Sequence, residues 1–200
     1  MAAQPPVGAA IAAITESPIE AVVESAVAGA SIAAIAAPTP GCAAEAGSAG
    51  VLVLGDIAFA NAAALLSRHG LELVAVDDGA AIPGSYWGEP EAGIIGSTVY
   101  ARADTPVHSM LHEACHLIVL PPERRAQVHT DATDSVPEED ATCYLQIVLA
   151  DALPGVGSAR LMADMDAWGY SFRLGSTRAW FERDADDARA WLAARSLPTA

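Results

Sequence analysis

The spacing of apolar residues changes character along this chain after about residue 50. Apolar residues recur at helical spacing over 57–69, and Gly70 stands where a helix of that length would end. Residues 71–76 alternate apolar and polar side chains before a turn sequence, which predicts a strand. A loop over 79–92 and a further strand over 93–102 are expected next.

The remaining pattern predicts helices. Thr105 and Pro106 are typical of an N-cap and a first helical position, so a helix is expected from there to about Val119, before Pro121. Further helices are predicted over 138–152, 158–168 and 177–195. A short sheet region followed by a C-terminal group of helices is an α+β fold.

The first quarter of the chain differs from the rest. Residues 1–50 are rich in Ala and Pro and contain no aromatic or basic residue, so we expect a low-complexity leader, disordered or partly helical, before a folded domain over 51–200. The start lacks the positive charge of a secretory signal. Its longest uncharged run, 25–37, is shorter than the roughly 20 apolar residues that span a bilayer.

Charge and cysteine content narrow the possible partners. The chain has 25 acidic and 10 basic residues and a formal net charge of −15. A charge of this sign disfavours nucleic acid and anionic membranes as partners. The 3 cysteines have no paired spacing, which predicts no disulfide framework and a cytoplasmic location.

One motif carries chemistry. His112-Glu113-Ala-Cys-His116 lies in the helix predicted after Thr105, and histidines four residues apart lie on one helix face. Two such imidazoles can bind one Zn²⁺, while Glu113 is placed to accept a proton from a zinc-bound water. The motif therefore predicts a zinc-dependent hydrolase with His112 and His116 as ligands and Glu113 as general base.

A catalytic zinc needs a third protein ligand. Glu138 and Glu139 open the next predicted helix, and His129 lies in the polar loop before it. Glu138 is preferred because Ala141, three residues later, is small enough to let two helices approach closely. Glu139, His129 or an Asp remain alternatives.

Together these residues resemble a family. The zinc motif followed by Glu138-Glu139-Asp-Ala-Thr142 resembles compact gluzincins, nearest to the ImmA/IrrE-type zinc peptidases, over about residues 57–152. The resemblance implies a zincin-like fold, a peptide or protein substrate, and an extended substrate lying along 93–102. Larger gluzincins have an Asp where this chain has Thr142, which puts the support of a zinc-bound histidine in doubt.

Alternatives remain open at this level. They are a zinc hydrolase of a non-peptide amide, a zincin-like domain that binds or regulates without turnover, and a helical protein without metal.

Oxyanion-stabilising candidates are Tyr86, Tyr144, Tyr170 and Arg173. His108 is expected to be partly exposed in the first helical turn. Cys115 and Cys143 are expected to be small buried residues rather than ligands.

Overall fold

A computed structural model of the chain describes residues 34–35, 50–86, 88 and 90–200. The chain divides into two units, Met1–Ala30 and Ser31–Ala200, and every described residue belongs to the second. Apart from residues 34–35 and Gly50, the leader predicted over 1–50 lies outside the described residues. Its boundary with a domain over 51–200 stays a prediction.

The described part of the chain is mixed α+β. Its main sheet has three strands, β2 (Glu72–Ala75), β3 (Gly93–Ile95) and β4 (Thr98–Ala101), in the order β2-β4-β3. β4 pairs parallel with β2 and antiparallel with β3. The single strand expected over 93–102 is wrong, because Gly96 at φ +60° turns the chain and folds the segment into a hairpin.

Helices account for most of the remainder. After a 3-10 turn, η1 (Leu54–Asp56), the α-helices are α2 (Phe59–Ser67), α3 (Val107–Val119), α4 (Pro122–Arg125), α5 (Val136–Ala150), α6 (Ser158–Trp168), α7 (Thr177–Arg183) and α8 (Asp186–Ala193). The short α4 was not expected. The helix predicted over 177–195 is two helices, since Asp184 leaves helical geometry at φ −140° and its carboxylate binds Arg173.

A second, two-stranded sheet was also not predicted. β1 (Ala34–Ile35) pairs antiparallel with β5 (Tyr170–Ser171), so that Ile35 lies opposite Tyr170. Strands of two residues give almost no periodicity that a sequence could reveal.

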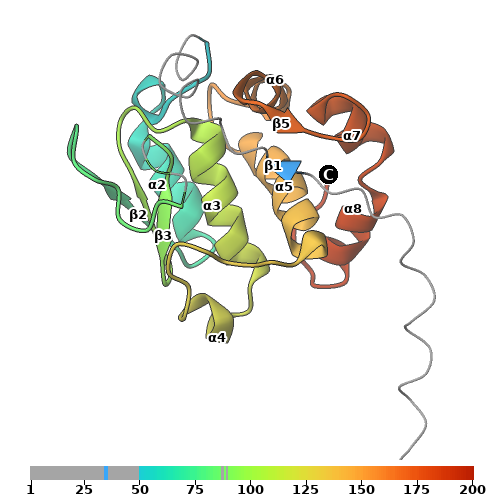
Figure 1. Cartoon of the computed structure of the whole chain (residues 1–200), viewed down its shortest axis with the longest axis horizontal. Coiled ribbons are helices and arrows are strands. Elements are labelled where there is room, and N and C mark those ends of the chain that lie inside the picture. The colour runs from blue at the N-terminus through green and yellow to red at the C-terminus, as the bar shows by residue number, and fades with distance from the viewer. Residues whose placement is uncertain (1–33, 36–49, 87, 89) are drawn as a thin grey trace, which may run out of the picture. The chain divides into compact units, whose positions relative to one another are not determined.

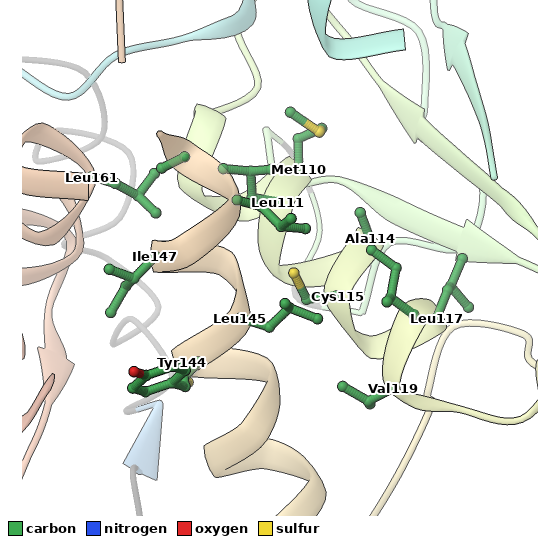
Figure 2. Packing of buried hydrophobic residues seen from close by; sticks show 14 of the residues in the cluster. Met110, Leu111, Ala114, Cys115, Leu117, Val119, Tyr144, Leu145, Ile147 and Leu161 are labelled. Carbon is green, nitrogen blue, oxygen red and sulfur yellow. The ribbon is translucent and has the colours of Figure 1, made fainter. Parts of the chain in front are cut away.

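The centre of the fold is the contact between α3 and α5 (Figure 1). The sheet packs on α3, while α6 and α8 pack on α5. Twelve of the thirteen residues of α3 are buried. Figure 2 shows Leu145 of α5 pointing toward Cys115 of α3, whereas Ile147 points toward Leu161 of α6. Both helices are therefore held on two sides.

None of the helices within the described ranges is both long and apolar enough to cross a bilayer.

Candidate metal centre

The two motif histidines face the same space. On α3, His112 and His116 lie one turn apart, and their Nε2 atoms are 3.0 Å from each other. Their rings meet edge to face with centroids 4.5 Å apart. The side chains are 7 % and 11 % exposed, so both imidazoles are close to fully buried.

α5 supplies a third group. The carboxylate oxygens of Glu139 lie 3.5 Å from Nε2 of His112 and 3.3 Å from Nε2 of His116. One ligand atom from each of the three residues falls within 4.8 Å of the others. Two neutral imidazole nitrogens and a carboxylate at this spacing are the donor set that zinc takes in hydrolases, so the residues present fit a metal ion.

The preferred third ligand is corrected by this geometry. Glu138, preferred from the sequence, turns away from the histidines and binds Arg124 at 2.6 Å. It also accepts a hydrogen bond from Thr133. His129 is exposed, with its Nδ1 2.9 Å from the hydroxyl of Thr130. Adjacent residues of a helix point about 100° apart, so only one of Glu138 and Glu139 faces α3.

Glu113 lines the same pocket as the three candidate ligands, a cavity of about 230 Å³. Burial raises the pKa of its carboxyl well above the ordinary value, and the negative charges of Glu91, Glu139 and Asp131 add to this. A carboxylate in such surroundings is stabilised by any cation placed beside it.

Burial also sets the protonation of the other groups. It lowers the pKa of His116 to about 4 and that of His112 well below its ordinary value, which keeps both imidazoles neutral near pH 7. Burial raises the pKa of Glu139 to about 7. Neutral imidazoles are the form that binds metal.

Thr142 supports one of the histidines. Its hydroxyl oxygen lies 3.4 Å from Nδ1 of His116, and the residue is fully buried on α5, one turn before the contact with α6. When Nδ1 carries the proton and donates it to this hydroxyl, Nε2 keeps a free lone pair that can bind a metal ion. Nδ1 of His112 has no such partner among the described residues. With Glu139 as the third candidate ligand, the residue four positions later is Cys143, so the correspondence of Thr142 with the Asp of larger gluzincins, which assumed Glu138, does not hold.

A buried aromatic group surrounds the start of the motif. His108 is 1 % exposed and lies 5.1 Å from the Trp168 ring and 5.6 Å from the Tyr170 ring, between centroids. The partly exposed position expected for it is therefore wrong. Trp168 donates a hydrogen bond from Nε1 to the half-buried carboxylate of Glu91 at 3.1 Å. Both residues are separated from the motif in sequence, and no spacing pointed to them.

The four oxyanion candidates differ in how close they lie to the metal site. Tyr170 lies beside the site, with its ring centroid 6.0 Å from that of His112. Tyr86 lines the pocket. Tyr144, by contrast, stacks on Phe181 at 4.6 Å, and Arg173 pairs with Asp184. These last two are structural.

The strand region expected to bind substrate is already paired. β4 is the central strand. The amide of Ile94 on β3 donates to the carbonyl of Gly84, and the carbonyl of Ile94 accepts from Thr130. The hairpin over 93–102 therefore offers no open edge at Ile94.

The two described cysteines behave as small buried residues. Cys115 and Cys143 are both fully buried and unpaired. Burial raises the thiol pKa of each well above the ordinary value. Cys143 donates a weak hydrogen bond to Oε1 of Glu139 at 3.7 Å, and neither thiol belongs to the ligand group.

No family model, curated protein or solved structure matches this chain. The resemblance to gluzincins therefore rests on the motif and on the convergence of His112, His116 and Glu139.

Replacing Thr142 tests the support of His116. Thr142→Val removes the hydroxyl while nearly keeping the shape, and we expect zinc Kd to rise roughly tenfold, at the lower end of the cost of losing an outer partner. Thr142→Ser should restore binding, because it keeps the oxygen. The measurement is a competitive zinc titration against a fluorescent chelator.

The matched control is Thr177→Val, which removes another fully buried hydroxyl, bonded to Asp166. Zinc Kd should not change in this variant. Wild-type affinity in Thr142→Val, or no recovery in Thr142→Ser, would contradict a positioning role for this hydroxyl.

Proposed function

We propose that the protein is a zinc-dependent hydrolase, and specifically a peptidase. The observation that carries the proposal is that His112, His116 and Glu139 converge on one point inside a pocket that Glu113 also lines. Zinc bound there would act as a Lewis acid and bring the pKa of a coordinated water toward about 7. Three protein ligands leave a coordination position open for chemistry.

Glu113 is the proposed general base. Its carboxylate accepts a proton from the attacking water, whose oxygen adds to the carbonyl carbon of the substrate amide. The same carboxyl then gives the proton to the departing nitrogen, so that the C–N bond breaks to a carboxylic acid and an amine. Burial and the neighbouring negative charges raise its pKa, which makes the carboxylate a stronger base toward the attacking water.

Tyr170 is the proposed donor to the developing oxyanion. Burial raises the pKa of its phenol, which keeps the O–H proton available at neutral pH. Its ring lies against His112, and the negative groups around it include Glu113 and Glu139. A donor in a water-poor site stabilises negative charge far better than one in bulk water.

Two alternatives differ in what they predict. A hydrolase of non-peptide amides would bind zinc and use Glu113 in the same way but leave peptides intact. A domain that binds without turnover would bind zinc and be indifferent to loss of Glu113. Zinc content alone therefore does not distinguish these alternatives. Assays of peptide cleavage, combined with the activity of a Glu113 variant, do distinguish them.

The ligand set is tested by comparing two adjacent glutamates. Glu139→Gln removes a ligand, so we expect zinc Kd to rise more than roughly 100-fold, beyond the usual cost of losing an outer partner. Glu138→Gln is the matched control, since this side chain pairs with Arg124, and its zinc Kd should stay within about threefold. The reverse order, or no zinc uptake by the wild type, would contradict the assignment.

The general base is tested with zinc-loaded Glu113→Gln. This variant should keep about one zinc per chain and lose at least about 100-fold in kcat/KM on fluorogenic peptides, the lower bound for removing general-base catalysis. Glu138→Gln again serves as the control and should retain activity. A Glu113→Gln protein as active as the wild type would refute the proposed role.

A further inference from the structure

The pocket at the metal centre has an unusual balance of charge. Four carboxylates line it, those of Glu113, Asp131, Asp134 and Glu139, and no Lys or Arg does. The two histidines in its wall are the candidate metal ligands. Acidic side chains therefore dominate the charge of the rest of the described pocket wall.

The proposed chemistry accounts for only part of this charge. Glu139 and Glu113 serve the metal and the water, and a Zn²⁺ ion offsets two negative charges. Asp131 and Asp134 remain, both exposed at the pocket. Within the described residues neither carboxylate has a side-chain hydrogen bond or a cationic partner. The two nearest arginines along the chain are engaged elsewhere: Arg125 donates to the backbone carbonyl of His69, and Arg124 is paired with Glu138.

Asp131 lines the same pocket as Glu113 and Glu139. Its carboxylate therefore faces the space in which the substrate would be cleaved. A positive group of the substrate bound beside Asp131 would lie next to the bond being cleaved.

An aromatic ring completes this wall. Tyr86 lines the pocket and is 55 % exposed, which is far more than the core aromatics. The backbone of the loop just before Tyr86 lies against β3, where a Cβ added to Gly93 would lie 2.1 Å from the carbonyl oxygen of Pro83. Glycine at position 93 is thus what allows this loop to approach β3 so closely. An exposed ring beside carboxylates suits a cation carried on an apolar stem.

We propose that the site selects peptides with a basic side chain, arginine above lysine, beside the scissile bond. Asp131 and Asp134 bind the charged end of that side chain, and Tyr86 packs against its stem or guanidinium plane. Arginine is favoured because its planar group both pairs with carboxylates and stacks on aromatic rings. This inference rests on the proposed peptidase function and names the substrate class of the same pocket.

The test uses the zinc-loaded full chain and three peptides that differ at one position. The position holds arginine, citrulline, which has the same shape without charge, or glutamate. The arginine peptide should have a kcat/KM roughly tenfold above that of the citrulline peptide, as expected for two partly exposed ion pairs. The glutamate peptide should be the poorest. The advantage of arginine should shrink as salt is raised, because exposed charges are screened.

Substitutions test whether Asp131 and Asp134 cause the preference for arginine over citrulline. In the double variant Asp131→Asn/Asp134→Asn, the ratio between arginine and citrulline peptides should fall to about one. The matched control, Asp186→Asn/Asp187→Asn on α8, also removes two exposed acidic charges and should leave the ratio unchanged. A ratio near one in the wild type, or a ratio that survives in the Asp131/Asp134 variant, would overturn the inference.

A binding measurement separates this inference from the proposed hydrolysis. Zinc-loaded Glu113→Gln should bind the arginine peptide more tightly than the citrulline peptide by calorimetry. If binding shows this preference but the wild type cleaves neither peptide, the peptidase proposal fails while the charge selectivity stands. If the wild type cleaves both peptides equally, the selectivity fails and the peptidase proposal stands. If neither is bound nor cleaved, both fail.

Discussion

The packing of α3 against α5 is the constraint on which the site depends. The two histidines come from one helix and the glutamate from the other, so no single element carries the ligand set. Cys115, which lies toward Leu145 of α5 in Figure 2, is a small and fully buried residue of this contact. Contacts of the sheet with α3 and of α6 and α8 with α5 hold the pair from outside (Figure 1). Ligand geometry is thus a property of the core.

That core carries an electrostatic cost. Glu113 and Glu139 are placed in a poorly solvated pocket, and burial raises the pKa of each. Removing ionisable groups from water is unfavourable unless a partner of opposite charge is present. A bound cation offsets this cost, so metal binding and folding stability should be coupled in this protein. The chain's excess of acidic residues, 25 against 10 basic, makes such a cation still more favourable.

Local sequence patterns were enough to predict most of the helices and the two histidines of the candidate metal site. α6 has the bounds that its periodicity predicts, and the motif lies in the helix expected for it. The choice between Glu138 and Glu139 was beyond sequence reasoning, because a rotation of one residue around α5 decides it and Arg124 competes for Glu138. The burial of His108 depends on Trp168 and Tyr170, about sixty residues away in sequence. Long-range packing leaves no local signal of this kind.

The central claim is that one zinc ion is held by two imidazoles and a carboxylate. Zinc K-edge X-ray absorption on the zinc-loaded full chain measures this ligand set directly. We predict two imidazole nitrogens at about 2.0–2.1 Å, with the remaining ligands oxygen at about 2.0–2.2 Å. A sulfur shell at about 2.3 Å would place a cysteine at the metal, and together with weak imidazole scattering it would contradict the proposed ligand set.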